Sequence, residues 1–168
     1  VLELVSKRPD WGLDTNRRWS ELGVAYFSLG KLEPAEIIFR MVLSLRVGLF
    51  SEMSKGVAEV RDNLGQILKA KGELVESENL GLMAMRTYGE ITGIRSYDYA
   101  VCSVNLADLY MQMEHFEDAL ELCETAMDVF EEQCGKTSLE YIEGRILHAR
   151  ILVDLECPEE VVVARMLK

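Results

Sequence analysis

Hydrophobic positions recur along the chain at helical spacing. Leu22, Tyr26 and Leu29 follow one another at intervals of three and four residues, and the segments 64–68 and 106–110 repeat this spacing. Such intervals place apolar side chains on one face of an α-helix. No stretch of alternating polar and apolar residues bounded by turn residues competes with this pattern. The pattern therefore predicts an all-α chain.

The helical pattern itself repeats at a constant interval. When the sequence is shifted against itself by 42 positions it aligns without gaps, and small residues share one column at Gly23, Gly65, Ala107 and Ala149. A large side chain in this column would push two packed helices apart. We therefore interpret the repeat as a pair of helices that approach closely at the small residue.

Turn residues mark the junction between the two helices of each pair. Gly30 and Gly72 stand where a helix C-cap needs a positive φ angle. Glu33 follows in the first turn of the next helix, where it favours the helix dipole. Pro34 falls in the same early turn, where a missing N–H costs nothing.

The register of the repeat predicts where each unit lies. Residues 1–8 are expected to be the end of a preceding helix, followed by repeats at 16–50, 57–92, 96–134 and a truncated fourth repeat at 138–168. Terminal repeats normally carry capping helices. Both ends cut through a repeat and the chain does not begin with Met, so we expect the natural protein to be longer.

The first repeat contains Trp19-x2-Leu22-Gly23-x2-Tyr26, followed by Ala35-x3-Phe39. This arrangement resembles the signature of the tetratricopeptide repeat, whose usual unit is about 34 residues long. The longer unit found in this chain is similar to the repeats of kinesin light chains. The resemblance implies a right-handed α-solenoid of antiparallel helix pairs, with the first helices lining a concave groove.

The same resemblance assigns groove positions to the first helix of each repeat. The residues expected to line the groove are Arg17, Ser20, Glu21, Val24 and Phe27; Glu59, Asp62, Asn63, Gln66 and Lys69; Val101, Val104, Asn105, Asp108, Met111 and Gln112; and Glu143, Ile146, Leu147, Arg150 and Asp154.

Asn63 and Asn105 occupy the position where members of the family hold an extended peptide by its backbone. One carboxamide offers both a donor and an acceptor to a peptide unit. Phe27, Val104 and Met111 are expected to contact the side chains of such a peptide. The alternative for both asparagines is a solvated helix residue with no partner.

Charge limits the kinds of partner. The net charge is −11 with only 18 Lys and Arg, which argues against nucleic acid and against anionic membrane surfaces. Ser20 and Val24 stand in columns where carboxylate-binding members of the family carry Lys or Asn, while Glu59 and Asp108 add negative charge. We therefore expect a neutral or basic protein segment as the partner.

Acidic residues are concentrated towards the end of the chain. Residues 114–160 hold three Lys or Arg against fourteen Asp or Glu. Two interpretations remain open, namely a solubilising outer face and an acidic docking surface.

No residue pattern predicts catalysis, a metal or a cofactor. Cys102, Cys123, Cys134 and Cys157 form no CxxC pair, which is typical of a reducing compartment such as the cytoplasm. Cys123 takes a core column. His148 also stands in a core column, where a buried and hydrogen-bonded ring is expected. Apolar runs are too short to span a bilayer.

Together these observations predict a non-catalytic protein-binding scaffold or adaptor that captures a partner peptide or helix in its concave groove. The alternative is a structural subunit packed permanently in a larger assembly, such as a motor, ciliary or degradation complex. We expect self-association through the uncapped ends if the chain is such a subunit, and a monodisperse chain if it is an adaptor. An enzyme is the least favoured class.

Overall fold

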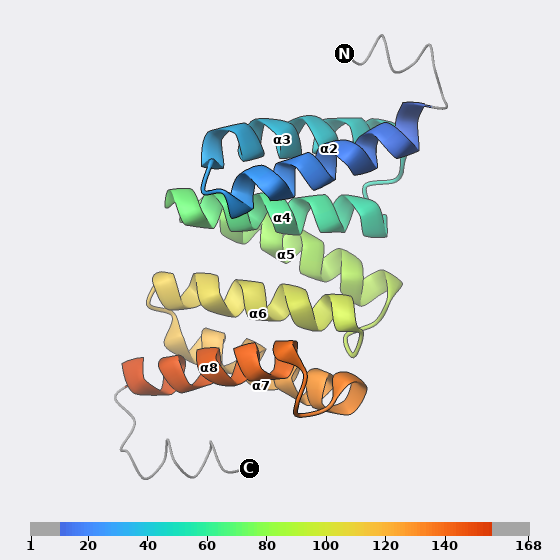
Figure 1. Ribbon diagram of the computed structural model, residues 1–168. Coiled ribbons are helices and arrows are strands. Elements are labelled where there is room, and N and C mark those ends of the chain that lie inside the picture. Colours follow the sequence, from blue (N-terminus) through green and yellow to red (C-terminus); the bar gives the residue numbers. More distant parts are fainter. Residues whose placement is uncertain (1–10, 156–168) are drawn as a thin grey trace. The chain divides into compact units, whose positions relative to one another are not determined.

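The computed structural model describes residues 11–155, and within them the chain forms helices and no strand. The helices are α2 (Trp11–Ser28), α3 (Leu32–Leu49), α4 (Lys55–Lys71), α5 (Leu74–Ile91), α6 (Tyr97–Gln112), α7 (Phe116–Cys134) and α8 (Leu139–Asp154) (Figure 1). The predicted all-α repeat fold is confirmed. The predicted helix end at 1–8 and the second helix of the fourth repeat lie outside the described residues.

The helices belong to two compact units. Unit 1 is Val1–Thr87 and unit 2 is Tyr88–Lys168, so the boundary falls inside α5. In unit 1, α3 packs against both α2 and α4 (Figure 1). In unit 2, α7 packs against both α6 and α8.

The core of unit 1 joins α3 to α4. Apolar side chains at helical spacing on each helix are buried against one another, each contributing about 1.5–3 kcal/mol when it is large and fully buried. The buried set is Ala35, Ile38, Phe39 and Val42 from α3 with Val60, Leu64, Ile67 and Leu68 from α4.

The small-residue column allows the helices of unit 1 to approach closely, as predicted. A Cβ atom added to Gly23 of α2 would lie 2.6 Å from Cε2 and 2.9 Å from Cδ2 of Phe39, which is 1% exposed. At Gly65 of α4, a Cβ atom would lie 3.4 Å from the carbonyl oxygen of Ser77. The Ser77 hydroxyl donates a buried hydrogen bond of 2.8 Å to the Gly65 carbonyl.

In unit 2 the same column is buried at Ala107, whereas Ala149 of α8 is half-buried. Ala107 of α6 is fully buried in one cluster with Ala119 and Cys123 of α7. The Cys123 thiol also lies 3.4 Å from the Gly144 carbonyl of α8, to which it donates a hydrogen bond. One small side chain therefore connects α7 to α8 by a polar contact inside an apolar core.

Turn glycines and serine caps define the helix ends. Gly30 and Gly72 have φ angles of 69° and 82°, which confirms the predicted left-handed turns. The helices α4, α6 and α8 each begin after an N-cap serine, at Ser54, Ser96 and Ser138. Each serine hydroxyl accepts a hydrogen bond from the backbone N–H three residues later, satisfying a donor that the helix leaves open. These caps recur at the interval of the repeat, and the sequence analysis did not use them.

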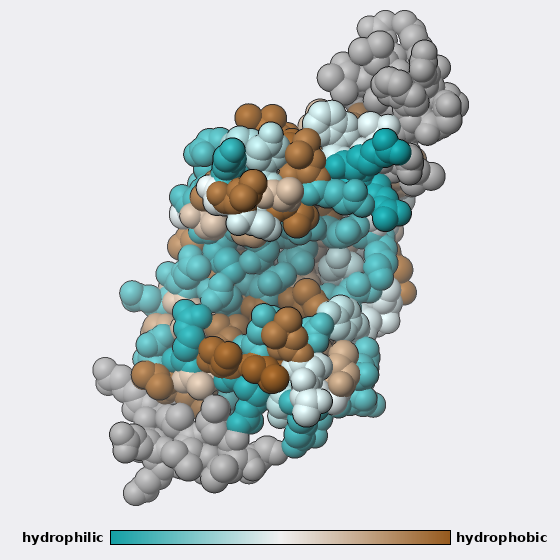
Figure 2. Space-filling view, in the orientation of Figure 1, coloured by the Kyte–Doolittle hydropathy of each residue, from teal (hydrophilic) through white to brown (hydrophobic). Residues whose placement is uncertain are grey.

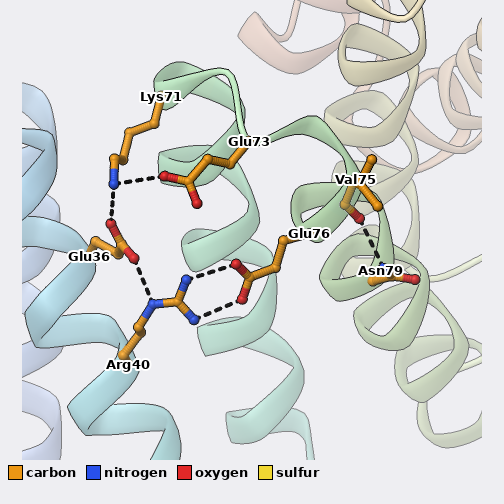
Figure 3. A network of polar contacts seen from close by, with 7 residues as sticks. All are labelled: Glu36, Arg40, Lys71, Glu73, Val75, Glu76 and Asn79. Atoms are coloured by element: carbon orange, nitrogen blue, oxygen red, sulfur yellow. Dashed lines mark hydrogen bonds and ion pairs between the residues drawn. The ribbon is translucent and has the colours of Figure 1, made fainter.

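Charged side chains on α3 and at the α4–α5 turn form a network in unit 1 (Figure 3). Arg40 makes two hydrogen bonds of 2.8 Å to the Glu76 carboxylate and one of 2.6 Å to Glu36. Lys71 donates to Glu36 at 2.5 Å and forms an ion pair of 2.8 Å with Glu73. The hydrogen bonds from Lys71 and Arg40 hold the pKa of Glu36 below its usual range. The network joins two successive helix pairs through residues far apart in the sequence.

The close contact at Gly23 gives a prediction about stability. We expect Gly23→Ala to leave the chain about 1–3 kcal/mol less stable than Gly48→Ala, as measured by urea unfolding followed by circular dichroism. A Cβ at Gly48, in the last turn of α3, meets no atom within 4 Å, so Gly48→Ala adds the same methyl group without a clash. Equal free energies of unfolding for the two variants would show that the contact between Gly23 and Phe39 does not limit the packing of α2 on α3.

The network predicts how stability depends on pH. Because the folded-state pKa of Glu36 is lowered, its ion pairs stabilise the fold above the usual pKa of 4.5 and are lost as the pH falls through the folded value. We expect Glu36→Gln to reduce the free energy of unfolding at pH 7 by at most about 1 kcal/mol. The loss should shrink steadily below pH 4.5. The matched variant Glu78→Gln, on α5 outside the network, should reduce the free energy of unfolding by less. A reduction in Glu36→Gln that is the same at every pH would contradict the role given to Glu36.

Candidate functional site

A groove of about 850 Å³ lies in unit 1 between α2, the end of α3 and the first half of α4. It brings together six residues that the sequence predicted for the groove, from two different repeats. Its lining residues are Asn16, Arg17, Ser20, Glu21, Val24, Arg46, Phe50, Ser54, Gly56, Glu59 and Asn63.

The wall formed by α2 carries an ion pair and an apolar side chain. Arg17 and Glu21 are one helical turn apart and form a pair of 2.9 Å, with both side chains largely exposed. Ser20 donates a hydrogen bond of 3.0 Å to the Asn16 carbonyl. Val24, one turn further along α2, is 44% exposed. This wall therefore offers both charged and aliphatic surface to a partner.

Arg46 joins the three helices around the groove, and the sequence analysis missed it. It extends from the last turn of α3 and is only 12% exposed. Its guanidinium donates to the Gly56 carbonyl, to the Glu59 carboxylate at 3.0 Å and to the Ser20 hydroxyl at 3.3 Å. The guanidinium group suits such a triple contact, because its N–H donors are held in a rigid plane and point in several directions.

A signal for Arg46 was present in the repeat. The corresponding positions of the next two repeats hold Tyr88 and Phe130, which are 5% and 2% exposed. A charged residue in a column of buried aromatic rings must find polar partners, because an unpaired buried charge is costly. In unit 1 those partners are the polar groups of the groove.

Asn63 lies on the α4 side of the groove, half-buried. Its Nδ2 atom donates a hydrogen bond of 2.8 Å to the Glu59 carbonyl one turn earlier. The expected double contact with a peptide unit stays a prediction, because the Nδ2 amino group has two N–H donors and the helix uses one of them. The Oδ1 atom is the group that a partner N–H would meet.

The remaining predicted residues of unit 1 do not line this groove. Phe27 is half-buried and packs against the core of unit 1. Asp62, Gln66 and Lys69 are half-buried on α4. They lie further along the helix or on a neighbouring face, since a helix turns by about 100° per residue.

In unit 2 the structure places several predicted residues in or beside the core. Val101 and Val104 are half-buried against the buried side chains of α6 and α7. Met111 was expected in the groove, but it is buried at 9% exposure with Leu147 and Ile151 of α8. The flexible thioether fills the space between α6 and α8, which removes it from a partner's reach.

The polar predictions of unit 2 fall at its surface. Asn105 and Asp108 are half-buried on α6, and Gln112 is exposed at the end of this helix. The Asp108 carboxylate lies 3.7 Å from the Arg150 guanidinium of α8. Glu143 and Asp154 are exposed on α8, whereas Leu147 is buried.

Two titratable side chains of unit 2 are buried in its core. Burial raises the pKa of the Cys123 thiol to about 12, so it stays protonated and is a poor nucleophile. His148 is buried, and its Nε2 lies 3.2 Å from the Glu124 carboxylate, as expected for a core histidine. Within residues 11–155 no group of three His, Cys, Asp or Glu is placed to hold a metal ion.

The groove of unit 1 is electrically balanced. Arg17 is paired with Glu21, and Arg46 with Glu59. The exposed apolar surface of the groove comes from Val24 and Phe50, whose exposed fractions are 44% and 41%. A site with two internal ion pairs, hydroxyl and amide groups and two apolar side chains can hold a polypeptide segment by hydrogen bonds and one or two apolar contacts.

None of the helices in residues 11–155 combines the length and the apolar content needed to cross a bilayer.

Sequence comparison identifies one repeat directly. Residues 100–138 match the model of a tetratricopeptide repeat family. No curated protein matches the chain by sequence.

Solved structures extend the likeness to most of the chain. BtubC (BKLC) from P. vanneervenii is similar with a TM-score of 0.79 and 21% identity, over 90% of this chain and 61% of that one. A kinesin light chain protein with nearly identical TPR-like repeats from Podosopora anserina is similar with a TM-score of 0.81 and 14% identity, over 89% of this chain and 72% of that one. A variant of the same protein gives 0.80 and 15% over the same shares.

The chain thus spans less than two thirds of the length of BtubC. At these identities the structural likeness establishes the fold. The resemblance inferred from the sequence is confirmed: residues 100–138 carry a tetratricopeptide repeat, and the chain has the all-α fold of TPR-like, kinesin-light-chain-type repeats.

Proposed function

We propose that the chain is a non-catalytic protein-interaction scaffold whose groove in unit 1 holds an extended segment of a partner protein. The observation that carries this proposal is the convergence of Arg17, Ser20, Glu21 and Val24 of α2 with Glu59 and Asn63 of α4 on one groove of about 850 Å³. The resemblance to the tetratricopeptide repeat assigns all six of these residues to the groove. A repeat fold of paired helices supports such a role, because stacked first helices present a continuous binding surface.

Asn63 and Val24 would make the main contacts. The Oδ1 atom of Asn63 accepts a backbone N–H of the bound segment, while the Nδ2 atom stays on the Glu59 carbonyl. Val24 and Phe50 receive an apolar side chain of the segment. Arg46 acts as a positioning residue, because it holds α2, α3 and α4 around the groove.

Charge favours a neutral or basic segment. Both arginines of the groove are already paired with carboxylates, so a partner carboxylate would have to displace Glu21 or Glu59. The exposed side chains of Glu21 and Glu59 can instead accept a partner cation at their free oxygen lone pairs. The cysteines within residues 11–155 form no disulfide with one another, which fits a reducing compartment such as the cytoplasm.

A structural subunit is the second candidate, and exposed apolar side chains favour it. In unit 1, Leu29 and Ile37 are 70% and 69% exposed, and Val75 is 69% exposed. Scattered apolar residues of this size are ordinary on a free surface, but they also suit permanent packing in an assembly. A chain that is monodisperse in sedimentation velocity across a wide range of concentrations would speak against this candidate.

The groove can be tested with peptides selected on the whole chain from a random phage-displayed library. We expect Asn63→Ala and Val24→Asp each to weaken binding of the selected peptides by about tenfold or more, equivalent to about 1.4 kcal/mol. The measurement is fluorescence polarisation of the labelled peptide.

Asn79→Ala provides the matched control for Asn63→Ala. Asn79 of α5 donates a hydrogen bond of 3.0 Å to the Val75 carbonyl one turn earlier, the same contact that Asn63 makes on α4, but it lies outside the groove (Figure 3). The Asn79→Ala variant should bind the selected peptides with the affinity of the wild type. Equal affinities for wild type, Asn63→Ala and Val24→Asp would remove the basis of the proposal.

A further inference from the structure

The two ion pairs in the groove of unit 1 differ in how far they are buried. In the pair of Arg17 and Glu21, the side chains are 79% and 62% exposed. In the pair of Arg46 and Glu59, the arginine side chain is only 12% exposed, while that of Glu59 is 57% exposed. Water and salt screen the charges of an exposed pair, but they screen a largely buried charge much less. The charge that a bound segment meets in the groove is therefore set mainly by Arg46 and Glu59.

Two neutral groups hold the Arg46 guanidinium in place independently of Glu59. Its N–H groups donate to the carbonyl of Gly56 and, at 3.3 Å, to the hydroxyl of Ser20. Without the charge of Glu59, the guanidinium would keep these two contacts but lose the carboxylate with which it is paired. A largely buried charge that loses its counter-charge is costly. A carboxylate from a bound segment would then be favoured at this position.

Gly56 makes room for this arginine. The next two repeats carry an acidic residue at the corresponding position, Asp98 and Glu140, in the first turn of α6 and α8. Such a residue favours the helix dipole, whereas α4 has no acidic residue in its first turn. A Cβ atom at Gly56 would lie 3.3 Å from Nη1 of Arg46, which is a tight contact. The first turn of α4 is thus fitted to the arginine and not to the dipole.

Glu59 presents the rest of its carboxylate to the groove. Its Oε2 atom meets Arg46 at 3.0 Å, so Oε1 can accept hydrogen bonds from a basic side chain of a bound segment. Asn63, one turn further along α4, lines the same groove. The surface over α4 is mainly hydrophilic in the space-filling view (Figure 2). A carboxylate of a bound segment would face the like charge of Glu59 here and would have to displace it from Arg46.

We propose that Glu59 is the residue that determines, by charge, which segments the groove of unit 1 accepts. It neutralises Arg46 and thereby excludes acidic segments, and it offers its exposed oxygen to a Lys or Arg side chain of a basic segment. This role rests on the function proposed above, because it assigns charge selection to the same groove. Specificity of this kind comes as much from rejecting the wrong partner as from contacting the right one.

The test is a parallel selection of peptides from a random phage-displayed library on the whole wild-type chain and on Glu59→Gln. Glutamine keeps the size of the side chain and an oxygen that can accept from Arg46, but it removes the charge. We expect neutral or basic peptides from the wild type and peptides rich in Asp and Glu from the variant. In fluorescence polarisation, these acidic peptides should bind Glu59→Gln about tenfold or more tightly than the wild type, and more weakly as salt is raised.

Two control variants separate this role from a general loss of negative charge. Glu76→Gln removes a carboxylate from Arg40, outside the groove, so it should select the same peptides as the wild type. Glu21→Gln removes the carboxylate of the exposed pair, so it should change the net charge of the selected peptides less than Glu59→Gln does. Circular dichroism checks that each variant is folded, and Glu59→Ala takes the place of Glu59→Gln if the glutamine variant is not folded.

Acidic peptides from the wild type would overturn the proposal, and so would peptides of equal net charge from the wild type and Glu59→Gln. A change in Glu21→Gln as large as that in Glu59→Gln would do the same, because the burial of Arg46 would then not matter. Failure of the groove itself looks different, since Asn63→Ala and Val24→Asp would then leave the affinity of every selected peptide unchanged. If these two variants weaken binding but the charge of the selected peptides does not change with Glu59, only the role of Glu59 is lost.

Discussion

The close approach of paired helices at the small-residue column is the constraint on which the described structure depends. Gly23 of α2 leaves room for the ring of Phe39, and the Ser77 hydroxyl donates a hydrogen bond to the carbonyl of Gly65. Arg46 of α3 contacts Ser20 of α2, the helix that Gly23 brings close to α3, and it also contacts Glu59 of α4. The groove of unit 1 is therefore a consequence of backbone packing that a single methyl group would disturb.

Local and periodic features could be predicted from the sequence, whereas contacts set by three-dimensional packing could not. Gly30 and Gly72 need a positive φ angle whatever surrounds them, and the burial of Cys123 and His148 follows from their columns in the repeat. Met111 was misplaced because one column can face a groove or a core, depending on how α8 packs against α6. Arg46 was missed because its partners come from three helices, although its place in an aromatic column was visible.

Charge in the groove of unit 1 is paired internally, so hydrogen bonds and the contacts of Val24 and Phe50 would carry recognition. Such a site can arise from substitutions at a few columns of one repeat, with the helix pairs unchanged.

Hydrogen–deuterium exchange of the whole chain, with and without a peptide selected on it, tests the central claim most directly. The account predicts slower exchange on binding in α2 and the first half of α4, around Val24 and Asn63, because the bound segment covers that groove. The outward face of α7, where Glu117 and Glu121 are exposed, should be unchanged. Protection of α7 with no change in α2 and α4 would contradict the account and assign recognition to the acidic surface.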